Sequence, residues 1–224
     1  CVICSLAARD ILKWPPAHVS AMCSAALSMN IGMTELQDRL AVQKSPPTQE
    51  QLSRIDGHAA GSVELLQKMG VSNELWLQAV LNHRGNAPGP LAARSDGQRI
   101  ARLIQRADMF AARLSPRASR APESPSTAMQ SCYFDENRQI DEAGVAIIKA
   151  VGIYSPGTFV KLVTNEIAVV IKRGLKCFRR VDAGPGRPDI QGNRPGSDDQ
   201  LPHGCHLPRP PDAYVQRSQY RRVG

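Results

Sequence analysis

Apolar residues recur at helical spacing over most of the first 150 positions of the chain. Apolar and small residues follow a helical period over 2–12, a Lys-Trp-Pro-Pro run at 13–16 interrupts them, and the pattern resumes over 19–27. The sequence therefore predicts a pair of helices at the start of the chain.

The next predicted helix has clear signals at both ends. A Ser-Pro-Pro turn precedes Thr48 and Gln51, which have the spacing of a capping box, and Gly70 is placed to end the helix. Ser72 is the predicted cap of the following helix, whose LWLQAVL segment is apolar almost all round and is therefore expected near the centre of the domain. The face of the first of these helices that we expect to be buried consists of Leu52, Ile55, Ala59, Val63, Leu66 and Met69.

Beyond a Gly- and Pro-rich loop at 84–96, the pattern predicts a long amphipathic helix from Gln98, then shorter ones near 126–133 and 140–151. From about 158 to 172 the period becomes that of alternating strands rich in Val, Ile and Phe, which is typical of a β-hairpin. The predicted fold class is therefore mainly α: a helical bundle with a small C-terminal β-hairpin and an irregular basic tail.

The composition changes abruptly after Lys176, where Pro, Gly and Arg dominate. We expect one domain over 1–176 and a disordered tail over 177–224, for which a shifted reading frame is one explanation and a native tail the other. Because the chain begins within a helical pattern, we also expect an upstream helix to be missing. A His-Gly-Cys-His run at 203–206 is a weak metal motif within this tail.

The composition of the 224 residues narrows the function classes. The formal net charge of +8 is spread along the chain and aromatic residues make up only 4%, which favours contact with anions but disfavours nucleic-acid binding. No apolar run approaches the roughly 20 residues of a spanning helix, and no signal peptide is recognisable. The six cysteines have irregular spacing, which favours packed, reduced thiols over redox or zinc chemistry and indicates a cytoplasmic protein.

Several stretches between positions 1 and about 174 together carry a family signature. They are HAAGSVELLQKMGV from His58, LWLQAVLNH, RIARLIQRADMFAARLSPRASR, YFDENRQID and AIIKAVGIYSPGTFVKL, of which the last is the most specific. In these stretches the chain resembles the HD-GYP branch of the HD-domain metal-dependent phosphohydrolases. The resemblance implies an HD-domain helical fold and a place in bacterial signalling, where this family linearises cyclic di-GMP.

Such enzymes hold two or three iron or manganese ions through an HD pair, a later single His, an HH pair and a further Asp. On this sequence the SMNIGM segment occupies the place of the HD pair and its following Lys, so Met29, Asn30 and Met33 are degenerate ligand positions. A thioether is soft and neutral, and a carboxamide is uncharged. Neither replaces an imidazole or a bridging carboxylate at a hard-metal site.

The resemblance assigns three surviving candidate ligands, His58, His83 and Asp108, which together would hold a single iron or manganese ion. Asn82 and Arg84, on either side of His83, are the degenerate members of the HHE segment. A clamp of two metal ions is therefore not expected.

Each candidate ligand also has a structural interpretation. His58 would be a half-buried, hydrogen-bonded core residue, and His83 would cap a helix C-terminus in its positive form. Asp108 would form a salt bridge with Arg84, Arg117 or Arg120, and an Arg84–Asp108 pair would be the natural remnant of a site that has lost its cations.

Basic residues after the long helix are candidates for phosphate or nucleotide binding. Arg117 and Arg120 keep the Ser-x-Arg-x-x-Arg spacing that the family uses near its nucleotide, and Lys149 would support the same anion. The alternative is that these arginines are solvated or engage the helix C-terminus.

The sequence therefore predicts a catalytically impaired HD-GYP-like signalling domain that acts by binding a partner protein or a cyclic dinucleotide. The alternative is a metal-dependent phosphohydrolase with a reduced metal site. No cofactor is implied beyond the one ion of that alternative.

Overall fold

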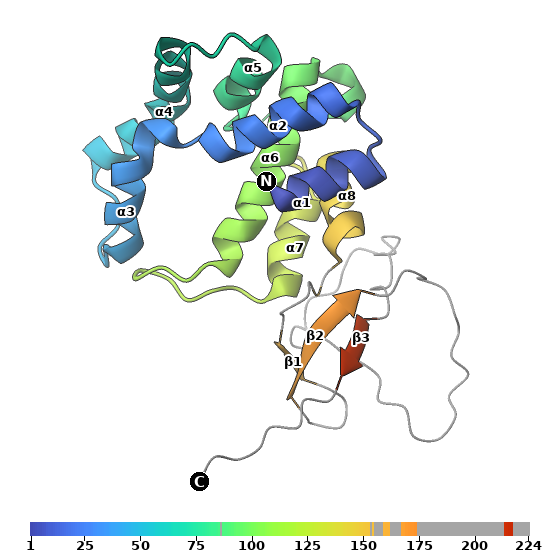
Figure 1. Cartoon of the computed structure of the whole chain (residues 1–224). Helices are drawn as coiled ribbons and strands as arrows, with labels where there is room; N and C mark the ends of the chain where they lie inside the picture. The colour runs from blue at the N-terminus through green and yellow to red at the C-terminus, as the bar shows by residue number, and fades with distance from the viewer. Residues whose placement is uncertain (86, 153, 155–158, 162–166, 174–212, 217–224) are drawn as a thin grey trace, which may run out of the picture. The chain divides into compact units, whose positions relative to one another are not determined.

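The computed structural model describes residues 1–85, 87–152, 154, 159–161, 167–173 and 213–216. Its contacts divide the chain into two compact units, Cys1–Ala150 and Val151–Gly224. The described part is mainly helical, as the sequence predicts (Figure 1).

Helices dominate the chain up to residue 151, and all of the predicted helical segments are present. In chain order the elements are α1 (Val2–Leu6), the π-helical η1 (Ala7–Ile11), α2 (Pro16–Ser28), the 3-10 helix η2 (Ile31–Met33), α3 (Thr34–Val42), α4 (Gln49–Lys68), α5 (Glu74–Asn82), the 3-10 helix η3 (Leu91–Ala93), α6 (Asp96–Leu114), α7 (Pro125–Tyr133) and α8 (Glu142–Val151).

The long helix α6 lies in the middle of the helical unit and packs against α1, α2, α5 and α7 (Figure 1). Its apolar side chains at helical spacing are buried from Ile100 to Phe110, whereas Ala111 is exposed and Leu114 is half-buried near the end of the helix. Helix α5 packs against α2, α4 and α6, which confirms its predicted central position. The buried residues of these two helices include Leu77, Ala79, Val80, Ile100, Leu103, Ile104 and Phe110.

The capping box of α4 is confirmed: Thr48 Oγ1 accepts from the Gln51 backbone N–H, and the Gln51 side chain accepts from the Thr48 N–H. Gly70 follows the helix with φ of +88°, a left-handed conformation suited to glycine. The predicted cap of α5 is wrong by one residue, because Asn73 rather than Ser72 accepts from the Trp76 N–H.

The predicted buried face of α4 is partly wrong. Leu52 and Met69, near its two ends, are 41% and 66% exposed. The residues that are buried on α4 are His58, Ala59, Ser62 and Leu66. This difference arises because η2 and α5 pack against α4 and bury its middle, where polar side chains find hydrogen-bond partners.

A buried ionic cluster joins α6 to the segment before α8. The Arg102 and Arg106 guanidiniums contact one oxygen of Asp141, with Nε–Oδ2 distances of 2.8 and 3.2 Å, and both also contact Glu136. The other Asp141 oxygen accepts from the Gly144 N–H at 2.9 Å and caps α8. We call Arg102, Arg106, Glu136 and Asp141 the ionic cluster. It fixes the 135–141 segment on α6.

The strands of the second unit are β1 (Phe159–Lys161), β2 (Ile167–Arg173) and β3 (Ala213–Gln216), in the sheet order β1-β2-β3. Both pairs are antiparallel; Val160 lies opposite Ala168, and Val170 opposite Val215. The turn of the hairpin predicted over 158–172 lies outside the described residues, as does the predicted tail over 177–224 except for β3. Hairpin and tail therefore stay predictions.

Among the helices that the structure describes, none combines the length and the apolar character that a membrane crossing requires.

Candidate functional site

Two of the predicted ligands meet in the structure. His58 lies on α4, and His83 directly follows the last residue of α5. Their Nε2 atoms are 3.0 Å apart and their rings meet edge to face, with centroids 4.9 Å apart. Both side chains are buried, His58 at 5% and His83 at 4% exposure, so the prediction that His58 is half-buried is wrong. We call these two residues the histidine pair.

The other ring nitrogen of each histidine faces a backbone carbonyl three residues earlier. His58 Nδ1 lies 2.5 Å from the Ile55 oxygen, and His83 Nδ1 lies 2.6 Å from the Val80 oxygen. A carbonyl oxygen only accepts hydrogen bonds, so each Nδ1 carries a proton and donates it. A neutral imidazole protonated at Nδ1 has its lone pair on Nε2.

The geometry therefore points two Nε2 lone pairs at each other across 3.0 Å. Such a contact is stabilised when one cation lies between the nitrogens, either a shared proton or a metal ion. A backbone carbonyl that holds the remote N–H is also the usual support of a metal-bound imidazole.

The pKa of His83 is lowered to about 4, chiefly by burial; the hydrogen bond to the Val80 carbonyl opposes this shift, and the charges of His58 and Arg84 add to it. His83 does engage a carbonyl at the end of α5, as the capping interpretation expects. The expectation that its positive form is favoured is wrong, because desolvation outweighs the helix dipole. Neutral His83 is the form suited to accept a proton or to bind a metal.

Asp108 lies on α6 with an exposed side chain. Restricted hydration by the surrounding protein raises the pKa of its carboxyl, and the charges of Arg117, Arg84 and His58 oppose this shift. The predicted Arg84–Asp108 salt bridge is wrong: Arg84 pairs with Asp56 of α4 instead, with a nitrogen–oxygen distance of 3.5 Å. Arg84 lies just after the C-terminal end of α5, close to α4. Asp56 of α4 is therefore nearer to its guanidinium than Asp108 is.

Of the three predicted ligands, His58 and His83 are in direct contact. Within the part of the chain that the structure describes, no group of three His, Cys, Asp or Glu side chains is arranged to hold a metal ion. The histidine pair offers two ring nitrogens whose lone pairs could bind a metal ion. Asp108 interacts with His58 through its charge but does not form a three-ligand group with the two histidines. The donor set therefore fits at most one ion with open coordination positions.

The degenerate SMNIGM segment packs beside the histidine pair. The Gly32 N–H donates to Ser62 Oγ at 3.0 Å, and a Cβ atom at Gly32 would lie 3.2 Å from the His58 carbonyl oxygen. Met29 and Met33 are buried at 8% exposure each. The backbone of the segment at Gly32 therefore packs on the turn of α4 that carries His58, and its two methionines are buried.

The remaining degenerate position at the end of α5 has a local role. The half-buried Asn82 donates through Nδ2 to the Gln78 carbonyl oxygen at 2.8 Å, one turn earlier on the same helix. This bond holds the amide on α5.

The three predicted phosphate-binding residues make different interactions in the structure. Arg117 and Arg120 exchange backbone hydrogen bonds of 3.0 Å in the loop after α6, and the Arg120 guanidinium donates to the Ala112 carbonyl, the helix-end contact named as the alternative. Arg117 is exposed and acts on Asp108 through its charge. Lys149 is exposed on α8.

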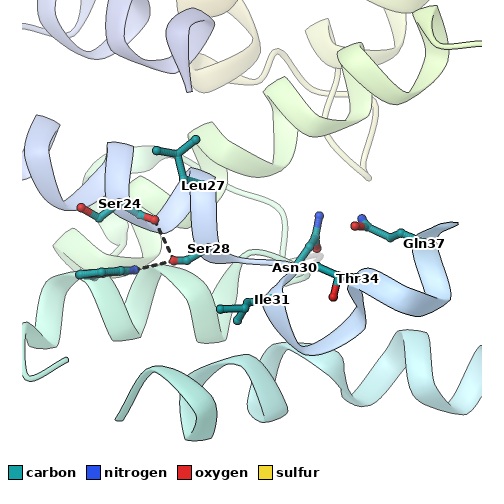
Figure 2. A pocket seen from close by; sticks show the side chains of 8 residues that line it. Ser24, Leu27, Ser28, Asn30, Ile31, Thr34 and Gln37 are labelled. Carbon is teal, nitrogen blue, oxygen red and sulfur yellow. Dashed lines mark hydrogen bonds between the residues drawn. The ribbon is translucent and has the colours of Figure 1, made fainter. Parts of the chain in front are cut away.

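A cavity of about 500 Å³ lies where α2, η2, α3 and α5 adjoin (Figure 2). The sequence does not predict this cavity, because its residues form no motif; Ser28, Asn30 and Ile31 belong to the SMNIGM segment, which the family resemblance singles out for a different reason. We call it the Asn30 cavity. Side chains that line it include Leu27, Asn30, Ile31, Thr34, Gln37 and Trp76.

The fold and the site together define a mainly helical protein with a buried histidine pair. Comparison with protein-family models, with curated proteins and with solved structures found no match to the chain.

Proposed function

We propose that the chain is an HD-GYP-like signalling domain whose hydrolytic centre is degenerate, and that it acts by binding a partner protein or a cyclic dinucleotide. The observation that carries the proposal is the packing of the SMNIGM segment against α4 beside His58, with Met29 and Met33 buried. Soft, neutral thioethers do not hold a pair of hard cations.

The loss of a two-metal centre has a large kinetic consequence. If the missing Lewis acid contributed about 4 kcal/mol to transition-state stabilisation, hydrolysis would be about a thousandfold slower, since each 1.4 kcal/mol is a factor of ten. At such a rate binding, not turnover, is the useful property of the domain.

The positive charges of two described arginines support the anion-binding part of the proposal. Arg117 is exposed, and Arg84 and Arg117 both act electrostatically on Asp108 beside the histidine pair. Arg120 is engaged at the end of α6, so Arg117 is the residue we expect to contact a phosphate.

Titration with labelled cyclic di-GMP tests this proposal. We expect saturable binding with a Kd below about 1 mM, at least tenfold weaker binding by the Arg117→Ala variant, and unchanged binding by Arg54→Ala, which removes an exposed arginine from α4. No saturable signal up to about 1 mM would exclude the nucleotide and leave only a protein partner.

A second function is favoured by the opposed Nε2 lone pairs of the histidine pair. His58 and His83 would hold one iron or manganese ion, which would supply Lewis-acid activation of a water and charge neutralisation at a phosphoester. The chain would then be a phosphohydrolase with a reduced metal site.

Metal analysis separates the two functions. The degenerate domain is expected to purify with less than stoichiometric metal. One equivalent of iron or manganese that is lost in His83→Ala but kept in His18→Ala, together with cyclic dinucleotide turnover, would favour the phosphohydrolase. His18 is a suitable control because it lies on α2, outside the predicted ligand set, with its Nε2 3.8 Å from Asp96 Oδ2.

A further inference from the structure

We infer that the Asn30 cavity is a binding site for an uncharged, planar, hydrogen-bonding ring of the purine class. The inference does not rest on the proposed function, since neither the histidine pair nor Arg117 lines the cavity. Its volume of about 500 Å³ is within the range of small-molecule sites and accommodates a purine nucleoside.

One wall of the cavity is a fixed aromatic ring. The Trp76 indole Nε1–H donates to Ser28 Oγ at 2.8 Å, and the Ser28 hydroxyl donates to the Ser24 carbonyl oxygen at 2.8 Å (Figure 2). This chain of hydrogen bonds joins α5 to α2 and holds the indole in place before any ligand arrives. A rigid, half-exposed indole is a stacking surface that loses little entropy when a planar ring binds.

The cavity lining also includes two carboxamides, Asn30 and Gln37. Figure 2 shows the Asn30 and Gln37 side chains, from the segment after α2 and from α3, extending toward each other. Neither amide forms a hydrogen bond with another described residue, so both keep a donor and an acceptor for a ligand. A carboxamide matches a ring edge that presents one donor beside one acceptor, as purine bases do.

The chemistry of the lining residues disfavours anions and metal ions as ligands of this cavity. Every side chain that lines the cavity is uncharged. An anion such as phosphate would find no cation there, and a metal ion would find no carboxylate, imidazole or thiolate. Leu27, which is 77% exposed, and Ile31 add apolar surface beside the indole, which favours a flat ring over a sugar.

Fluorescence titration of the full chain tests the inference. The chain has two tryptophans, so the Trp14→Phe variant leaves Trp76 as the sole reporter. We expect adenosine or guanosine to quench its emission saturably, with a Kd of about 0.1–1 mM, while ribose and inorganic phosphate cause no saturable change.

Variants locate the binding. In the Trp14→Phe background, Asn30→Leu and Gln37→Leu should each weaken nucleoside binding about tenfold, because each removes a hydrogen-bonding partner. Gln67→Leu, which changes an exposed amide on α4, should bind as the parent does. Arg117→Ala should also bind as the parent does, which separates this site from the proposed phosphate contact.

Two results would overturn the inference. One is the absence of saturable quenching by either nucleoside up to about 5 mM. The other is undiminished binding by the Asn30→Leu/Gln37→Leu double variant, which would place the ring elsewhere.

Discussion

Gly144 of α8 lies directly against the backbone of α7. A Cβ atom built there would lie 1.8 Å from the Cys132 carbonyl oxygen and 2.7 Å from its carbon. Because these are backbone atoms, the overlap is relieved only by moving one helix. We predict that Gly144→Ala lowers the free energy of unfolding by about 3 kcal/mol or more, measured by denaturant titration.

Gly57, on the exposed side of α4, is the matched control, because a Cβ atom there meets no atom within 4 Å. Gly57→Ala should stabilise the protein by about 0.5–1 kcal/mol through helix propensity. A Gly144→Ala variant as stable as the parent would show that α7 and α8 do not pack as described.

Two buried thiols predict how stability depends on pH. Burial raises the pKa of Cys4 to about 11 and that of Cys132 to about 12. A raised pKa in the folded state means that stability is complete below the unfolded pKa of about 9 and is lost as the pH rises through the folded value. We predict a loss on the order of a few kcal/mol between pH 9 and about 12.

Denaturation midpoints at several pH values check this prediction. The Cys132→Ala variant should lose less stability above pH 9 than the parent does, whereas Cys1→Ala, which changes an exposed thiol, should follow the parent. Equal pH dependence in all three proteins would contradict the prediction.

At the scale of elements, the ionic cluster is the main polar connection between α6 and the start of α8. The Arg102 and Arg106 side chains are 2% exposed, and Asp141 contacts both. We predict that Asp141→Ala lowers the free energy of unfolding by about 3–5 kcal/mol. The substitution leaves Glu136 as the remaining acidic partner of two buried guanidiniums, and it removes the cap of α8. Denaturant titration against Asp38→Ala, an exposed control, measures this loss.

An Asp141→Ala variant that loses less than about 1 kcal/mol would mean that Glu136 and water compensate both arginines. Sequence analysis missed this cluster, although a signal existed. Arg102 and Arg106 are four residues apart on α6 beside its apolar face, and three acids follow within 135–141.

Most helices were predictable because their signals are local. The Thr48–Gln51 capping box and Gly70 act within one helical turn, and both are confirmed. The buried face of α4 was not fully predictable. Leu52 and Met69 have the right spacing, but they lie near the ends of α4, while η2 and α5 pack on its middle.

At the scale of the whole molecule, the division after Ala150 predicts an independently folding helical unit. A chain that ends at residue 152 keeps α1 to α8, the ionic cluster and the histidine pair. We predict that it melts cooperatively, with a Tm within about 5 °C of the full chain, followed by circular dichroism. A broad, non-cooperative transition would show that the helical unit depends on the rest of the chain.

The candidate site was predictable as a set of residues but not as an arrangement. The family resemblance predicts His58, His83 and Asp108 as candidate ligands, and their role as ligands stays a prediction. It did not anticipate that the two imidazoles touch through Nε2, that Arg84 selects Asp56, or that Asp108 stays exposed.

The sequence by itself determined the mainly helical class and the start and end of α4. These features depend on residue identity and on neighbours within about one turn. The tertiary structure decided the histidine pair, the ionic cluster and the Asn30 cavity. Their members lie far apart in the sequence: Trp76 and Ser28, for example, are 48 residues apart. Contacts between such positions exist only after helices pack and exclude water.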